Sequence, residues 1–402
     1  MSPPIRFGTD GVRGPVGTWP ITSAGAEAIG LGIATWVHGG TVFVGRDTRE
    51  SGPELIQAMI RGLTLGGSTA VRLGILPTAA VSAAVASDED AVAGVMVTAS
   101  HNPWADNGIK VLDAAGEKLT DSEPLLACIA SPLAQASGEA TDHPDPLAAW
   151  TSSLPQVDLS GRIILLDAAH GAGSVTSLDA LEAAGAQVRS VGVSPNGRNI
   201  NEGVGSMHPP TDLQGCDFAI CLDGDADRLV MVDPHHGVLD GDDLLWILAQ
   251  ATNGPVVGTV MSNGGLEEAL AGRLVRTDVG DANVHAEMVR IGAQLGGEPS
   301  GHIMIQGGMP TSDGLYTALR VLQAAQGGPL PIGGWKRWPQ AKQNVRGVGL
   351  DPNLDAIHSA QESGHRVLVR ASGTEPVVRV MVEGPQAEMW TEQIAKALPP
   401  LT

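Results

Sequence analysis

The sequence predicts an α/β fold: three related α/β domains with mixed, largely parallel sheets, followed by a smaller C-terminal α+β domain. Three times along the chain, an apolar run is followed by a glycine-containing turn and then by an amphipathic helix, which is the start of a βαβ unit. The 53 glycines and 27 prolines are typical of many short connections between strands and helices. Residues 336–402 lack this pattern and predict a different, smaller module.

The three repeated units follow one another in chain order. The expected strands are residues 41–44, 163–166 and 256–260, and the turns that follow them are residues 45–47, 167–171 and 262–265. Pro53 opens the first helix, and apolar side chains from Leu55 to Leu63 recur there at helical spacing. Direct similarity among the three units is weak, so the repeat is inferred from the pattern alone.

The C-terminal residues predict two strands, 365–369 and 377–382, that flank a loop and precede a helix over about 387–398. Stretches near 135–150, 234–242 and 327–339 have the composition of domain boundaries. The predicted domains are therefore residues 1–140, 141–236, 237–335 and 336–402.

Composition and charge exclude several classes of function. A formal net charge of -20 disfavours nucleic acid as a partner, because its phosphates would be repelled over most of the surface. No apolar run approaches the roughly 20 residues that span a bilayer, and the N-terminus lacks a signal peptide, so we expect a cytoplasmic protein without a membrane partner. Cys128, Cys216 and Cys221 show no CxxC spacing, which fits a reducing compartment. Whether the chain forms a homodimer is left open.

Two loops carry the strongest chemical signal. Residues 98–103 place Ser100 after an apolar strand, and residues 223–228 place Asp223, Asp225 and Asp227 after another. Alternate carboxylates on a tight turn suit a hard divalent cation, and a serine oxygen or its phosphate could complete the ligand shell. The pair indicates phosphoryl transfer through a metal-bound serine. A structural metal or a solvated acidic turn is the alternative for the aspartates, and a capped turn is the alternative for Ser100.

An EF-hand does not explain the aspartates. Its loop needs glycine at the sixth position and an acidic residue at the twelfth, where this chain has Arg228 and Pro234. An α/β-hydrolase triad is not expected either, because Ser100 lacks a GxSxG elbow.

Two further segments suit a phosphorylated sugar. Residues 370–376 combine a glycine turn with hydroxyl and guanidinium donors, which is the chemistry of an anion cradle. Its members are Arg370, Ser372, Gly373, Thr374 and the nearby Arg379. The loop 297–302 brings together the carboxylate of Glu298, the hydroxyl of Ser300 and the imidazole of His302, and carboxylates and hydroxyls suit vicinal sugar hydroxyl groups. An ordinary hairpin and plain turn chemistry are the respective alternatives. Arg13, in a glycine-rich loop without GxGxxG spacing, can point at a phosphate rather than at a dinucleotide.

Taken together, these motifs resemble the α-D-phosphohexomutases over nearly the whole chain. The motifs that carry the resemblance are FGTDGVRG (7–14), TASHNP (98–103), DGDADR (223–228), VGTVMSNGGLE (257–267), GGEPSGH (296–302) and RASGTEPVVRVMVEG (370–384). The first and last resemble the glucosamine branch more than the branch that acts on mannose and glucose phosphates. Ala226 stands where glycine is usual in the metal loop.

The resemblance implies four domains around a central active-site cleft and a serine, here Ser100, that carries a catalytic phosphate. It implies one Mg²⁺ per chain, held by Asp223, Asp225, Asp227 and the phosphoserine. Glu298 and Ser300 would bind sugar hydroxyls. Arg370, Ser372, Gly373, Thr374 and Arg379 would hold the substrate phosphate that is not reacting.

The implied reaction is an isomerisation of a phosphorylated amino sugar, from glucosamine 6-phosphate to glucosamine 1-phosphate, through a hexose 1,6-bisphosphate that is both intermediate and activator. Arg228 and Arg13 would add positive charge near the transferring group, and Lys110, His101 and His302 are the candidates for the base. The alternatives are a mutase acting on mannose or glucose phosphates, a non-catalytic sugar-phosphate-binding protein and a metal-dependent phosphatase.

Overall fold

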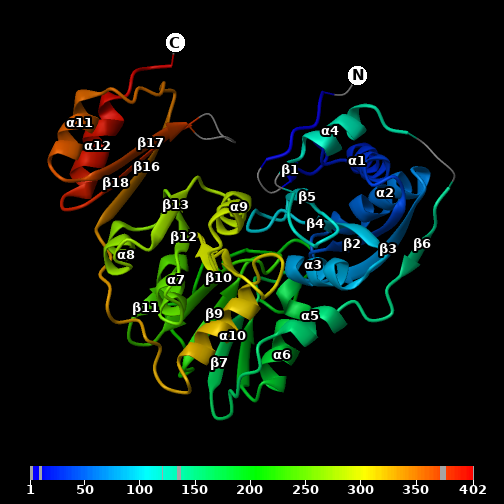
Figure 1. The fold of residues 1–402 in the computed structure, drawn as a ribbon, viewed down its shortest axis with the longest axis horizontal. Coiled ribbons are helices and arrows are strands. Elements are labelled where there is room, and N and C mark those ends of the chain that lie inside the picture. The colour runs from blue at the N-terminus through cyan, green and yellow to red at the C-terminus, as the bar shows by residue number, and fades with distance from the viewer. Residues whose placement is uncertain (1–2, 9–10, 120, 134–136, 372–376, 402) are drawn as a thin grey trace. The chain divides into compact units, whose positions relative to one another are not determined.

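The structure is a computed structural model that describes residues 3–8, 11–119, 121–133, 137–371 and 377–401. The chain divides into two compact units (Figure 1). The first comprises residues 1–259 and 277–332, and the second comprises residues 260–276 and 333–402. Within the described ranges, no helix combines the length and the apolar character needed to cross a membrane.

The first unit begins with a six-stranded sheet in the order β1-β5-β4-β2-β3-β6. β2 pairs in parallel with β3 and β4, and β3 with β6, whereas β5 is antiparallel to β1 and β4. The strands are β1 (Val12–Pro15), β2 (Gly40–Arg46), β3 (Ser68–Ile75), β4 (Ala91–Val97), β5 (Asp106–Leu112) and β6 (Ala140–Asp142). The helices are α1 (Ser23–Trp36), α2 (Gly52–Leu65), α3 (Thr78–Ser87), α4 (Glu123–Ala130) and α5 (Ala148–Ser153).

Helices cover both faces of this sheet, with α1 and α2 on one face and α3 on the other (Figure 1). Successive side chains of a strand point to opposite faces of the sheet, so β2 contributes residues to the helix layer on each face. Val42 and Val44 belong to the core cluster formed with α1 and α2. On the opposite face, a Cβ at Gly45 would lie 2.6 Å from Val81 of α3, so glycine allows this helix to pack closely.

A five-stranded sheet follows in the order β11-β10-β9-β7-β8. β7 is parallel to β8 and β9, and β10 is antiparallel to β9 and β11. The strands are β7 (Ile163–Asp167), β8 (Gln187–Val191), β9 (Phe218–Leu222), β10 (Leu229–Asp233) and β11 (Gly237–Leu239). The 3₁₀ turn η1 (Ala172–Val175) and α6 (Ser177–Ala183) follow β7. Every residue of β9 and β10 is buried, as near-continuous apolar runs predict.

The rest of the first unit contains α7 (Gly241–Ala249), β12 (Val256–Thr259), α9 (Asp281–Ile291), β14 (Leu295–Gly297), β15 (Ile303–Ile305) and α10 (Gly314–Ala324). β12 is parallel to β14, and β14 is antiparallel to β15. The loop between β14 and β15 contains residues 298–302.

The second unit is built on an antiparallel sheet in the order β16-β18-β17, with α11 and α12 contributing to its core. Its elements are β16 (Gln340–Arg346), α11 (Asp355–Glu362), β17 (Arg366–Ala371), β18 (Val377–Glu383) and α12 (Ala387–Ala397). The segment 260–276 contains α8 (Gly264–Ala269) and ends within β13 (Leu274–Thr277). Arg366 holds this segment, because its guanidinium donates to Val260 O at 2.7 Å and Ser262 O at 2.9 Å.

The predicted fold class is confirmed: mixed, largely parallel sheets with helices, followed by a smaller C-terminal α+β module. The division into four domains at residues 140, 236 and 335 stays a prediction. The grouping of 260–276 with the C-terminal residues follows from side-chain contacts that the strand and helix pattern does not encode.

Candidate active site

Ser100 lies in the loop that follows β4, and the loop that follows β9 reaches it. Ser100 is 2% exposed and has a left-handed backbone with φ of 52°. Its Oγ donates to Asp223 Oδ2 at 2.6 Å. A Cβ at Gly224 would lie 2.4 Å from Ser100 O, so glycine is required for the two loops to approach this closely. The serine and the acidic turn therefore form one site.

The three aspartates of the second loop converge. Asp223, Asp225 and Asp227 are each 0% exposed, and each offers one carboxylate oxygen within 4.8 Å of the others. Asp225 Oδ1 is buried and has no hydrogen-bond partner among the described residues. Because a buried carboxylate oxygen without a partner is costly, this atom fits a metal ligand. Three carboxylates so arranged match the oxygen donors that Mg²⁺ prefers.

Burial and the neighbouring Asp227 and Asp225 raise the pKa of Asp223 to about 7. Arg228 opposes this shift, with Nε 3.8 Å from Asp223 Oδ2 and its amide N donating to Oδ1 at 3.1 Å. The Asp223 carboxyl therefore takes up a proton near neutral pH, which a bound cation would have to displace.

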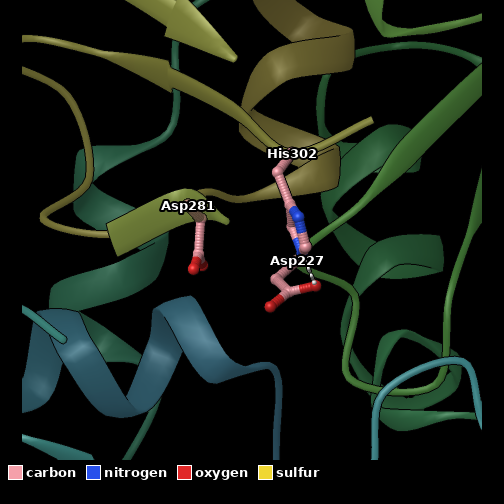
Figure 2. Close-up of side chains that lie close together, drawn as sticks. All are labelled: Asp227, Asp281 and His302. Atoms are coloured by element: carbon pink, nitrogen blue, oxygen red, sulfur yellow. Dashed lines mark hydrogen bonds and ion pairs between the residues drawn. The ribbon is translucent and has the colours of Figure 1, made fainter. Parts of the chain in front are cut away.

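Positively charged side chains surround Asp227. Lys110 Nζ lies 2.8 Å from Oδ2, Lys118 Nζ lies 3.3 Å from the same oxygen, and His302 Nε2 lies 3.0 Å from Oδ1. Burial acts to raise the pKa of Asp227, but Lys110, His302 and Lys118 together hold it well below its usual range. Lys118 also forms an ion pair with Asp281, at the first residue of α9. Figure 2 shows Asp227, Asp281 and His302 side by side.

His302 is a cation at neutral pH. Burial acts to lower its pKa, but Asp227 and the hydrogen bond to Glu298 outweigh that effect and raise it to about 10. Its Nδ1 lies 3.1 Å from Glu298 Oε2, and Gly280 N donates to Glu298 Oε1 at 2.9 Å. Glu298 thus has a fixed orientation beside the acidic site. Ser300 lies exposed in the turn between Glu298 and His302.

His101 is uncharged at neutral pH. Its pKa is lowered to about 3 by burial and by the nearby positive charges of Arg228 and Arg13. Its Nδ1 lies 3.3 Å from Ser100 Oγ. Arg13 belongs to β1, where its side chain is exposed.

The predicted phosphate cradle belongs to the second unit. Arg370 of β17 and Arg379 of β18 are cross-strand partners. They line a cavity of 300 Å³ together with Lys342 and Asn344. Ser372, Gly373 and Thr374 lie outside the described residues. The described part of the cradle is therefore strongly cationic, as an anion site requires.

Several residues of the site were not predicted from the sequence. Thr78 Oγ1 donates to Asp225 Oδ2 at 2.6 Å, and Lys118 and Asp281 carry no motif that marks them. Arg49 and Asn201 both donate to Ser100 O, each at 2.9 Å. A usable signal existed for Arg49, because it follows the first predicted turn after a parallel strand, where ligands and reactive groups gather in α/β folds.

Family models of phosphoglucomutase/phosphomannomutase match three parts of the chain: α/β/α domain I at residues 4–130, α/β/α domain III at 240–333 and the C-terminal domain at 339–398. The chain is 39% identical to the phosphoglucosamine mutase of Nitrosococcus oceani, over 94% of this chain and 93% of that protein. It is 40% identical to the phosphoglucosamine mutase of Acidothermus cellulolyticus, over 99% and 95% respectively.

Solved structures share the fold. A phosphoglucomutase/phosphomannomutase family protein from Burkholderia thailandensis has a TM-score of 0.79 at 22% identity, covering 97% of this chain and 98% of that chain. The N-acetylphosphoglucosamine mutase of Aspergillus fumigatus, in complex with GlcNAc-6P and magnesium, has a TM-score of 0.68 at 19% identity, covering 98% and 95%. At these identities the likeness concerns the fold alone.

Proposed function

Because the chain belongs to the phosphoglucosamine mutases of the phosphohexomutase superfamily, we propose that it interconverts glucosamine 6-phosphate and glucosamine 1-phosphate. The observation that carries the proposal is the buried contact of Ser100 Oγ with Asp223, inside a cluster of three carboxylates. A serine in that position is placed to exchange a phosphoryl group beside a divalent cation.

Mg²⁺ fits the acidic cluster. Asp223, Asp225 and Asp227 would hold it, and the unpartnered Oδ1 of Asp225 supports this assignment. When bound, Mg²⁺ offsets negative charge on the transferring phosphoryl group and on the serine oxygen.

Ser100 Oγ gives up the phosphoryl group in the first half-reaction and receives one in the second. In the first, the bond between phosphorus and Ser100 Oγ breaks while a bond forms to O1 of glucosamine 6-phosphate, and the O1 proton passes to a base. The resulting 1,6-bisphosphate then turns end for end. In the second half-reaction, Ser100 Oγ takes the phosphoryl group from O6, the proton returns to O6, and glucosamine 1-phosphate leaves.

The surrounding side chains have three roles. Arg228 and Arg13 add positive charge near the transferring group, which is where negative charge accumulates. Glu298 and Ser300 bind sugar hydroxyls, and Glu298 is oriented by its hydrogen bonds with Gly280 N and His302. The cradle of Arg370, Arg379 and the intervening loop binds the phosphate that is not reacting.

Of the three candidates for the proton acceptor, His101 is the one that is uncharged at neutral pH, whereas Lys110 and His302 both form ion pairs with the aspartates and would have to lose a proton before accepting one. A pKa of about 10 keeps His302 charged at neutral pH, so it serves as a positive group that holds Asp227 and Glu298. His101 is uncharged and lies 3.3 Å from Ser100 Oγ, and Lys110 lies between Asp225 and Asp227. Replacing each by a residue that cannot accept a proton, with His101→Asn and Lys110→Met, should identify the base by the larger loss of kcat.

The test of the proposal is a comparison of isomerase activity on glucosamine, mannose and glucose 6-phosphates, each with Mg²⁺ and a trace of the matching 1,6-bisphosphate. We expect the highest kcat/KM for glucosamine 6-phosphate. Ser100→Ala should abolish turnover, and Ser152→Ala, at an exposed serine, should not. A higher kcat/KM for a neutral sugar would overturn the substrate assignment, and near-normal turnover by Ser100→Ala would overturn the phosphoserine.

A further inference from the structure

Arg49 is a buried charged residue with no place in the chemistry described so far. Its side chain is fully buried, at 0% exposure. Arg49 follows β2, which pairs in parallel with β4, and the last residues of the two strands, Arg46 and Val97, are paired. Parallel neighbours end at the same edge of a sheet. The segments that follow β2 and β4 therefore leave the sheet at the same edge, and Arg49 in the first reaches the Ser100 loop in the second.

All five N–H groups of the Arg49 guanidinium are used. Nε donates to Asp47 Oδ2 at 2.9 Å. The other four donate to backbone carbonyls of the serine loop: Ser100 O at 2.9 Å, Asn102 O at 2.8 Å, Asp106 O at 2.9 Å and Pro103 O. Since arginine has five donors in one plane, this single side chain fixes four peptide groups relative to one another.

Asp47 extends the contact back to Ser100. Thr98 Oγ1 donates to Asp47 Oδ2 at 2.7 Å, and Ser100 N donates to Thr98 Oγ1 at 2.9 Å. The carbonyl of Ser100 is held by Arg49 and its amide by Thr98, so hydrogen bonds define the peptide groups on both sides of the residue.

Ser100 needs this support because of its backbone. A φ of 52° is unfavourable for serine and persists only where the surroundings determine it. Asn201 is a second support, since Nδ2 donates to Ser100 O at 2.9 Å and to Asn102 O at 3.0 Å.

We propose that Arg49 is a positioning residue for phosphoryl transfer: its guanidinium holds the serine loop so that Ser100 Oγ points at the acidic cluster. The inference rests on the proposed function of Ser100. A lysine could not replace it, because an ammonium lacks the planar set of five donors. The expected effect falls on the chemical step, since small displacements of a reacting group lower rates steeply.

The kinetic test compares Arg49→Lys with Leu63→Ala, a variant of a fully buried core residue in α2 that serves as a control for general loss of stability. Each protein is phosphorylated on Ser100, and transfer to glucosamine 6-phosphate is followed in a single turnover. We expect Arg49→Lys to slow transfer about 100-fold with KM changed by less than about threefold. Leu63→Ala should stay within about threefold of the wild type per folded molecule. Equal losses in the two variants, or none in Arg49→Lys, would overturn the proposal.

A second measurement does not depend on the reaction. Amide hydrogen exchange at Asn102 and Asp106, whose N–H groups bond to Ala99 O and Pro103 O, reports the order of the loop. Arg49→Lys should speed exchange there about tenfold or more relative to Leu63→Ala. Unchanged exchange would overturn the proposal even if the enzyme is active. Faster exchange in a protein without mutase activity would leave the loop assignment intact and refute the proposed function.

If Arg49→Lys does not fold, Asn201→Asp provides the test. It keeps the size of the side chain and replaces the amide that donates to Ser100 O with a carboxylate that repels it. We expect a smaller loss of transfer rate in the same direction, again without a matching change in KM. A wild-type rate would overturn the inference that these donors position the loop.

Discussion

Lowering the pH should weaken the binding of divalent metal to the acidic cluster. Burial, Asp227 and Asp225 raise the pKa of Asp223 to about 7, so the carboxyl is protonated in a large fraction of molecules at neutral pH. A metal binds only the deprotonated form of its ligand, and binding must therefore release this proton. Affinity should be highest above pH 7 and fall as the pH drops below it.

The size of the effect follows from the pKa. For one proton with a pKa of about 7, the deprotonated fraction falls about 25-fold between pH 7.5 and pH 5.5, and the apparent affinity should fall by the same factor. This corresponds to about 2 kcal/mol of binding free energy.

Isothermal titration calorimetry with Mn²⁺ on the unphosphorylated protein measures the effect, because the phosphate of a phosphoserine would titrate in the same range. Asp223→Asn, which has no proton to lose, should bind more weakly at pH 7.5 and lose most of the pH dependence. An affinity that stays within about twofold between pH 7.5 and pH 5.5, or that rises on acidification, would show that metal binding does not displace a proton from Asp223.

Three other predictions concern stability. Burial raises the pKa of Asp313 to about 6, so the folded protein favours the protonated carboxyl. The stability that this protonated carboxyl contributes is fully present below the pKa of the unfolded chain and is lost as the pH rises through 6. In urea unfolding, the free energy of unfolding of the wild type should fall by up to about 3 kcal/mol relative to Asp313→Asn between pH 4 and pH 7. Ala226 has φ of 59°, so Ala226→Gly should stabilise the protein by about 1 kcal/mol in the same assay, and a destabilisation would contradict this. Lys118→Met leaves the carboxylate of Asp281 buried without its ammonium and should cost about 3–5 kcal/mol, part of which Lys118→Met with Asp281→Asn should recover; an equal loss in the double variant would contradict the pairing.

Elements were predictable where the apolar pattern is local. The apolar strand expected directly before Asp223 is β9 (Phe218–Leu222), and the strand expected at 163–166 is β7 (Ile163–Asp167). Both are continuous apolar runs bounded by polar turns, which is the signal of a buried strand. The serine loop and the acidic turn follow strands of two different sheets, β4 and β9, so their meeting could be anticipated only from the complementary chemistry of the serine and the carboxylates.

Contacts between distant loops were not predictable, because periodicity says nothing about which side chains meet. Arg49 lies 51 residues from Ser100, and Lys118 lies 163 residues from Asp281. Trp150 is a further example, since it is 2% exposed and donates to Asp313 Oδ2 at 2.5 Å, 163 residues further along the chain.

The most direct test of the account follows the phosphate itself. The protein is labelled with ³²P on Ser100, verified by peptide mapping, and mixed with unlabelled glucosamine 6-phosphate and Mg²⁺. We expect the label to leave the protein and to appear in glucosamine 1,6-bisphosphate and then in the monophosphates, with little inorganic phosphate. Label that stays on the protein, or that is released as inorganic phosphate, would contradict it.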